Sequence, residues 1–199
     1  MKLLNLLVAV ALTATACSAG AEELPQPQTT GGMPLMEAIQ ARHSSRDISA
    51  TSTVTKQDLS NMLWAAWGIT HDGKRSVATA MNRQELTFYV ITKAGVSRYS
   101  AETNSLTQVV AGDFTSLLGR PGFATDAPVS IVIVGDNTKQ QMAEFQHYAA
   151  GAASQDIYLY CAQAGLKTVV RAGLDRKTLG KAMKLADSEQ VLYVQTIGK

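Results

Sequence analysis

Apolar side chains recur every three or four residues in four stretches of the chain, and this spacing predicts helices. The stretches cover residues 34–43, 55–68, 138–164 and 175–184. The longest is closed by Gly165, because glycine commonly ends helices. Its centre is a run of alanines around Gly151, and such small side chains let another helix approach closely. We therefore expect this helix to pack tightly on a second one, within the chain or across a dimer.

β-Branched and aromatic residues dominate shorter runs, which predict strands. These runs cover residues 86–92, 95–100, 106–110, 128–135, 167–170 and 191–197. The run at 128–135 is apolar without alternation, as in a strand covered on both faces, and we also expect the strand at 167–170 to be buried. This order of elements predicts one α+β domain over residues 34–199. Residues 22–33, rich in Pro and Gly, predict a linker or an extended arm before it.

Residues 1–21 have the pattern of an export signal. Lys2 precedes a short apolar run, and small residues follow the run. Cleavage after Ala21 would leave a chain that starts at Glu22. Alternatively, the segment from Ala14 to Cys17 resembles a bacterial lipobox, in which a lipidated Cys17 would attach the protein to a membrane. Both routes predict an exported, periplasmic protein, and a retained anchor is the remaining alternative.

Composition and charge narrow the function. The chain has 199 residues, and its 18 basic and 16 acidic side chains give a formal net charge of only +2, which argues against a nucleic-acid partner. The sequence has no GxGxxG or GxxxxGK[ST] loop, no HExxH motif, no Cys and His cluster for zinc and no GxSxG elbow. Cys161 lies in an apolar helical stretch, so we expect a core residue rather than a catalytic thiol.

The first candidate for chemistry is the segment Arg42-His43-Ser44-Ser45-Arg46, at the end of the first predicted helix. Guanidinium groups bind phosphate through paired donors, and serine hydroxyls add neutral donors. Two arginines and two serines within five residues could therefore hold a monoester phosphate. The same residues also suit an ordinary solvated helix C-terminus, where basic side chains are favoured.

Two further clusters flank predicted strands. Directly before the strand at 86–92 lie Asn82 and Gln84, whose amides can bind the edge of a heterocycle. An ordinary polar turn is the alternative for this cluster. Gly173 follows the strand at 167–170, and a glycine there would let backbone N–H groups approach a planar ligand.

In their order and spacing these segments resemble the FMN-dependent nitroreductase family, from about Met33 to Lys199. The pieces that carry the resemblance are Arg42-His43-Ser44-Ser45-Arg46, Leu63-Trp64-Ala65-Ala66-Trp67-Gly68-Ile69, Asn82-x-Gln84, Gln155-Asp156-Ile157-Tyr158-Leu159, Gly165-Leu166 with Val169-Val170, and Gln195-Thr196-Ile197-Gly198. Each piece alone is common, and the ordered set is specific. The resemblance implies an α+β nitroreductase-like fold, with a central, mostly antiparallel sheet flanked by helices, and an interlocked homodimer. Two clefts at the subunit interface would each hold one FMN, and the helix around Gly151 would form the dimer.

The resemblance also implies which residues bind the cofactor. Arg42 and Ser44 would hold the phosphate, and Arg46 would lie near the flavin N1/O2 edge, where positive charge stabilises the reduced flavin. Residues 79–84 would approach the ring from the partner subunit, and the backbone at 172–173 would face its N5/O4 edge. The full set is Arg42, His43, Ser44, Arg46, Thr79, Ala80, Asn82, Gln84, Ala172, Gly173 and Lys199.

The chain departs from many relatives at two places. Val77-Ala78-Thr79-Ala80 stands where a Pro-Ser pair often precedes the asparagine, and Thr79 still offers a hydroxyl. Many relatives carry basic residues in a C-terminal extension near the phosphate, and here Lys199 would serve alone.

The implied reaction is carried by the flavin, so neither a catalytic side chain nor a metal is expected. A hydride would pass from NAD(P)H to flavin N5 and then to a small-molecule acceptor such as a nitroaromatic or a quinone. Because an exported protein meets little NAD(P)H, another donor or an FMN-dependent dehydrogenase reaction on an organic substrate is an alternative. A flavin-free binding or scaffold protein on the same fold is the second alternative.

Overall fold

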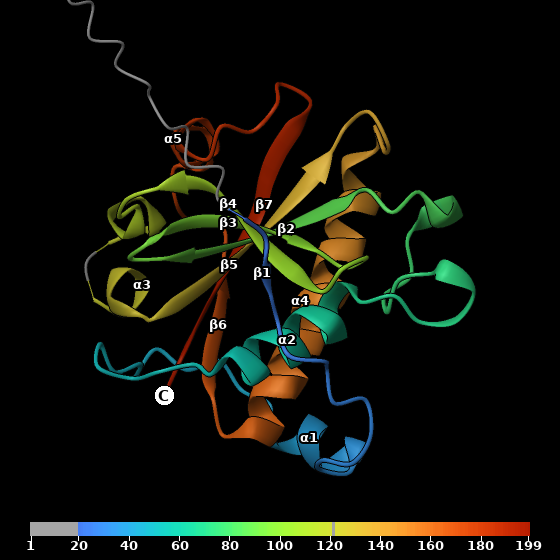
Figure 1. Ribbon diagram of the computed structural model, residues 1–199, viewed down its shortest axis with the longest axis vertical. Coiled ribbons are helices and arrows are strands. Elements are labelled where there is room, and N and C mark those ends of the chain that lie inside the picture. Colours follow the sequence, from blue (N-terminus) through green and yellow to red (C-terminus); the bar gives the residue numbers. More distant parts are fainter. Residues whose placement is uncertain (1–19, 121) are drawn as a thin grey trace, which may run out of the picture.

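The computed structural model describes residues 20–120 and 122–199 (Figure 1). Nearly all of the predicted export signal, including Cys17, lies outside these described residues. Within them, no helix combines the length and the apolar character that crossing a membrane requires.

In the described residues, seven strands form one sheet in which every neighbouring pair is antiparallel. In sheet order they are β1 (Glu22–Glu23), β4 (Ser105–Ala111), β3 (Gly95–Ser100), β2 (Leu86–Thr92), β5 (Val129–Asp136), β7 (Glu189–Gly198) and β6 (Lys167–Arg171). All six predicted strands are present, and β1 is an addition. The expected α+β fold with a central antiparallel sheet is confirmed.

The helices lie around this sheet (Figure 1). They are α1 (Leu35–Ala41), α2 (Lys56–Trp67), α3 (Phe123–Asp126), α4 (Ala143–Ala164), α5 (Arg176–Ala182) and the short 3-10 helices η1 (His71–Gly73), η2 (Ala80–Asn82) and η3 (Thr115–Leu118). A capping box opens α2, since the Thr55 hydroxyl accepts from the Asp58 N–H and the Asp58 carboxylate accepts from the Thr55 N–H. The predicted start of α4 at residue 138 is wrong, because the Asp136 carboxylate accepts the Thr138 N–H at 2.8 Å and turns the chain before the helix begins.

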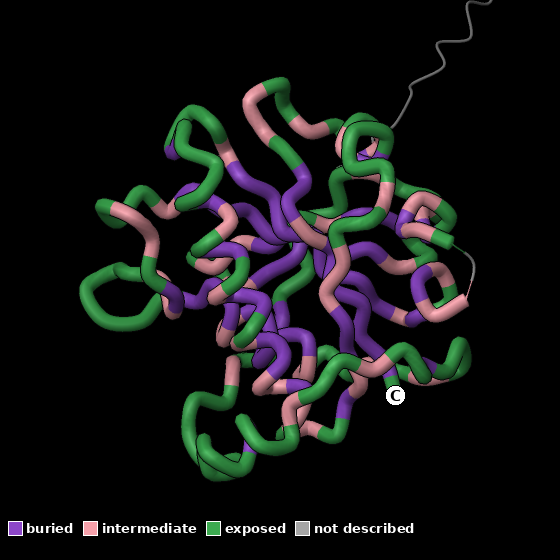
Figure 2. The backbone as a smooth tube through the Cα atoms, turned by 180° about the vertical axis from the view of Figure 1, so that it is seen from behind, coloured by how far each residue is buried: buried purple, intermediate pink, exposed green. Residues whose placement is uncertain are grey.

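Both faces of the central strands are buried. Along β2, Phe88 and Val90 pack toward α2 and α4, whereas Tyr89 and Ile91 pack toward α5 and η3. Figure 2 shows the buried positions gathered in the middle of the molecule and the exposed ones in the outer loops. Since side chains alternate between faces along a strand, burial on both faces explains the continuous apolar runs in the sequence. By contrast, β6 is an edge strand of which only Thr168 and Val169 are buried, so the expected burial of the whole strand is wrong.

The small residues of α4 pack the helix against α2 within the chain. Ala149, Ala150 and Ala153 are fully buried in the same cluster as the apolar face of α2, whereas Gly151 is exposed. Cys161 lies with its Sγ 3.6 Å from the Met62 Sδ, and burial raises the pKa of its thiol to about 12. Cys161 is therefore the core residue that was expected.

Residues 22–33 form an extended arm that is fixed to the domain. β1 pairs with β4, and Leu24 is buried. Further along the arm, the Pro25 carbonyl accepts from Ser60 Oγ at 2.5 Å and from Asn104 Nδ2 at 2.8 Å. The arm thus covers the edge of β4 and part of α2.

Asp156 gives a testable pH effect on stability. This half-buried carboxyl on α4 has no hydrogen-bond or ion-pair partner among the described residues, and burial raises its pKa to about 6. The folded state therefore holds a proton that the unfolded chain releases near pH 4, so this group favours folding at low pH and opposes it as the pH rises through 6. We expect Asp156→Asn to stabilise the protein at pH 7 by about 1–2 kcal/mol, after allowance for solvent screening, and to add nothing at pH 4.

Urea unfolding at both pH values measures this effect. The matched control is Asp187→Asn, which changes an exposed carboxyl and should leave the pH dependence as it is. An equal gain from Asp156→Asn at pH 4 and pH 7 would contradict the assignment of the effect to ionisation.

Candidate functional site

The segment Arg42–Arg46 lies against the free edge of the sheet. α1 ends at Ala41, and Arg42 is already in an extended conformation with φ −60° and ψ 122°. The Ser45 N–H then donates to the Thr168 carbonyl of β6 at 2.9 Å. The cluster is therefore a segment placed by tertiary contacts rather than the last turn of a helix.

A tyrosine of α4 holds two members of this segment. The Tyr158 hydroxyl lies 2.8 Å from Ser44 Oγ, and its ring lies 5.2 Å from the Arg42 guanidinium. Sequence reasoning assigned Tyr158 no role of its own, because a tyrosine on a buried helical face is expected to be a core residue. The sequence does contain one indication of this role, because a buried tyrosine hydroxyl requires a hydrogen-bond partner.

The donors in this segment are open to a ligand. Neither Arg42 nor Arg46 makes an ion pair with a carboxylate within the described ranges, and Ser44 and Arg46 are exposed. The nearby Asp47 is instead paired with Lys167 at 2.7 Å. Two guanidinium groups and a hydroxyl without an anionic partner fit a phosphate monoester, which presents several acceptor oxygens. His43 differs, because its Nδ1 donates to the Ala41 carbonyl at 2.9 Å and so caps the end of α1.

Lys199 is tied to the same side of the molecule. Its carbonyl accepts the Ser49 N–H at 2.8 Å. Burial raises the pKa of Asp58, but hydrogen bonds from Thr55 and Tyr160 and the positive charge of Lys199 outweigh it, so the pKa of Asp58 lies below its usual value. Part of the Lys199 charge thus acts on the start of α2.

The second cluster is a strained, exposed loop. Met81, Asn82 and Gln84 have φ values of 54°, 53° and 48°, in the left-handed region. Asparagine tolerates this region, whereas Met81 and Gln84 each adopt it at a cost of about 1–2 kcal/mol. The Gln84 side chain donates to Asn82 Oδ1 at 3.2 Å and accepts from Arg75 Nε at 2.9 Å. Met81 at the tip is 84% exposed. Strained backbone is common at functional sites, and this loop also exposes a methionine, so it is suited to contact another molecule.

The Thr79 hydroxyl has a structural task in this loop. It accepts the Gln84 N–H at 3.1 Å and so closes the turn through Ala80. The segment Val77-Ala78-Thr79-Ala80 therefore leads into a loop that a side-chain hydrogen bond closes.

The third cluster is an open turn after β6. The Leu174 N–H donates to the Ala172 carbonyl at 2.9 Å, and Ala172 and Gly173 are exposed. No atom lies within 4 Å of the position that a Cβ on Gly173 would occupy. A flat ligand could therefore approach this backbone closely.

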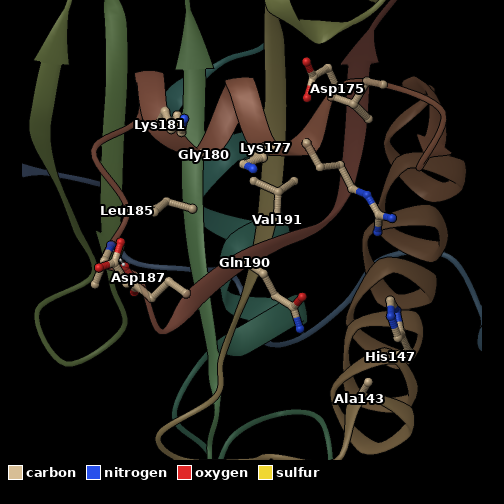
Figure 3. Close-up of a pocket in the computed structure, with 14 residues that line it drawn as sticks. Ala143, His147, Asp175, Lys177, Gly180, Lys181, Leu185, Asp187, Gln190 and Val191 are labelled. Carbon is tan, nitrogen blue, oxygen red and sulfur yellow. Dashed lines mark hydrogen bonds between the residues drawn. The ribbon is translucent and has the colours of Figure 1, made fainter.

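A cavity of about 630 Å³ begins directly after this turn, between α5, the start of α4 and β7 (Figure 3). Arg176, Lys177 and Lys181 line it, together with His147 and Gln190. None of the predicted cofactor residues lines it. The cavity therefore adjoins the third cluster at Leu174 but contains no predicted cofactor residue.

Two of the three clusters adjoin the same strand, β6. Residues 42–46 and 172–173 both flank β6, whereas residues 79–84 lie near the opposite end of α4, where the Arg83 guanidinium donates to the Lys139 carbonyl at 2.8 Å. Tyr158 lies fifteen residues after the start of α4, which corresponds to roughly 22 Å along the helix. A single chain therefore does not unite all the predicted cofactor residues in one cleft.

Comparisons with known proteins give the family. The chain matches the family model described as the nitroreductase family over residues 39–199. A solved structure from Ralstonia eutropha JMP134 with a nitroreductase assignment is 34% identical, with a TM-score of 0.85, and the match covers 94% of this chain and 92% of that chain. A protein of Methanocaldococcus jannaschii with the same assignment is 23% identical over 182 residues, which are 83% of this chain and 90% of that protein.

One similar structure contains a cofactor. A nitroreductase-assigned protein from Desulfovibrio desulfuricans, solved in complex with FMN, is 20% identical with a TM-score of 0.63, and the match covers 84% of this chain and 87% of that one. At 20% identity, this similarity shows a shared fold and no more.

Among the residues that the structure covers, no group of three or more His, Cys, Asp or Glu side chains is placed to hold a metal ion.

Proposed function

Because the chain belongs to the nitroreductase family and is thereby an oxidoreductase, we propose that it binds FMN and transfers hydride to a small-molecule acceptor. The donor in this proposal is NAD(P)H or another reduced compound, and the acceptor is a nitroaromatic, a quinone or a similar molecule. The observation that carries the proposal is the donor set Arg42, Ser44 and Arg46, which stands at the edge of β6 without a carboxylate partner among the described residues.

The side chains of this segment would bind and orient the cofactor. Arg42 and Ser44 would hold the phosphate, and Arg46 would supply positive charge to the N1/O2 edge of the ring. The open backbone at Ala172 and Gly173 would lie against the ring. Bound FMN supplies the chemistry, because it accepts a hydride and passes the electrons on, so no side chain of the chain needs to act as a nucleophile.

A second copy of the chain would complete the site. The strained loop at residues 79–84 lies near the other end of α4 from Ser44, so it can reach the same flavin only from a partner subunit. Met81 at the tip of this loop is 84% exposed, and a partner subunit in this position would cover its apolar side chain. The proposed enzyme is therefore a homodimer with both clefts at the interface.

The visible absorbance spectrum of the purified protein tests this proposal, together with the mass of the released cofactor. We expect a yellow protein that releases about one FMN per chain. The intact mass of the protein in the same sample shows where its chain begins. Export by the proposed routes gives either a chain that starts at Glu22 or a chain with a lipid on Cys17. A colourless protein that does not take up added FMN would overturn the proposal and favour the flavin-free binding protein.

A further inference from the structure

Tyr158 is a buried side chain whose hydroxyl connects three parts of the chain. It belongs to α4, and only 6% of the residue is exposed. Its oxygen lies 3.0 Å from the backbone nitrogen of Val170 in β6 and 2.8 Å from Ser44 Oγ. The segment that carries the proposed phosphate donors is thus linked to both α4 and β6 through one phenol.

The chemistry of the partners fixes the direction of these hydrogen bonds. The Val170 N–H can only donate, so the Tyr158 oxygen accepts from it. Tyr158 retains one hydrogen of its own, and Ser44 Oγ is the only other hydrogen-bond partner of its hydroxyl in the described part of the chain. Tyr158 therefore donates to Ser44, because the reverse direction would leave a buried O–H without an acceptor.

This direction leaves the hydrogen of Ser44 unused. Ser44 is exposed and accepts from Tyr158, so its own O–H can donate outward to a ligand oxygen. The Tyr158 ring meanwhile lies 5.2 Å from the Arg42 guanidinium and attracts it by a cation–π interaction. One side chain thus orients two of the donors.

We propose that Tyr158 is a positioning residue that aims Ser44 and Arg42 at the phosphate of the cofactor, and that it thereby sets the preference for FMN over unphosphorylated riboflavin. This inference rests on the proposed function, because it concerns the same site. It assigns to the chain a cofactor-specificity determinant outside the segment that touches the phosphate.

The test measures the affinities of the flavin-depleted full chain for FMN and for riboflavin. Tyr158→Phe keeps the ring beside Arg42 but removes the hydroxyl that orients Ser44. We expect it to weaken FMN binding by about 5- to 20-fold and to leave riboflavin binding within about twofold, because only the phosphate end loses a preorganised donor. Tyr158→Leu, which also removes the contact with Arg42, should lower the FMN preference further.

Two further variants make the test specific. Tyr160→Phe is the matched control, since the Tyr160 hydroxyl has the same pattern of bonds two residues later, accepting from Asn61 at 3.1 Å and donating to Asp58 at 2.9 Å. It should leave the ratio of the two affinities unchanged. Ser44→Ala removes an exposed hydroxyl, so it tests the same connection without disturbing the core. Combined with Tyr158→Phe it should cost no more FMN affinity than Ser44→Ala alone, because the Tyr158 hydroxyl acts through Ser44.

The outcomes separate the inference from the function on which it rests. A wild type that binds neither flavin overturns the proposed function, and the inference with it. A wild type that prefers FMN, with a Tyr158→Phe variant that keeps the preference or weakens both flavins equally, overturns only the inference. Additive losses from Ser44→Ala and Tyr158→Phe would also overturn it.

Discussion

Replacing both Arg42 and Arg46 by alanine is expected to abolish flavin retention by the purified protein. In the proposed site Arg42 binds the flavin phosphate, which carries close to two negative charges and matches the paired donors of a guanidinium. Arg46 supplies positive charge to the N1/O2 edge of the ring. Because no carboxylate pairs with either arginine within the described residues, the double change removes no ion pair from the fold. We expect at least a 100-fold loss of FMN affinity from two charged contacts at about 1.5–3 kcal/mol each.

Flavin absorbance after desalting, followed by titration of the depleted protein with FMN, measures this loss. The control is the double variant Arg98→Ala with Arg176→Ala, which removes two exposed arginines on β3 and α5 and lowers the formal net charge of +2 by the same amount. It should retain the flavin. If the Arg42 and Arg46 variant also retains it, the proposed flavin site is wrong.

Phe88→Ala is expected to lower the free energy of unfolding by about 3–5 kcal/mol. Phe88 is 1% exposed at the centre of β2, and its ring lies 5.6 Å from the ring of Trp67 at the end of α2. The change would leave a cavity between the sheet and α2 and would remove an aromatic contact. For a chain of this size the midpoint of thermal unfolding should fall by about 10 °C.

Urea and thermal unfolding at one protein concentration give both values. Phe145→Ala is the matched control, because this phenylalanine of α4 is 38% exposed, and its loss should cost less than about 1 kcal/mol in a single chain. Equal losses from the two variants would contradict the burial assigned to Phe88.

The sequence predicted best the elements whose signals are local. The strand at residues 86–92 has the predicted bounds because its apolar run is flanked by polar residues. α2 begins within one residue of the predicted start at 55, because Thr55 is its N-cap. The start of α4 was misplaced because one carboxylate, Asp136, turns the chain. The edge position of β6 was missed because only its pairing with β7 determines it, and pairing depends on the whole topology.

In the candidate site, too, sequence predicts the local features and misses those that depend on distant contacts. The donor chemistry of Arg42, Ser44 and Arg46 follows from residue types that stand together in the sequence. The role of Tyr158 does not, because it depends on a contact between residues far apart in the chain. No contact within the described residues brings residues 79–84 to Ser44, so one chain alone does not place them in a cleft with it. Their proposed role therefore remains a prediction.

The contacts that fix the Arg42–Arg46 segment also have a consequence for the order of assembly. Ser44 meets Tyr158 across 114 residues, and Asp47 meets Lys167 across 120. Contacts between such distant positions raise contact order and form slowly, because a large loop must close first. In a chain that is made from its N-terminus, this segment stays without these anchors until residues 158 and 167 have been made. The positioned arrangement of Ser44 and Asp47 is therefore a late product of folding, although the residues themselves are made early.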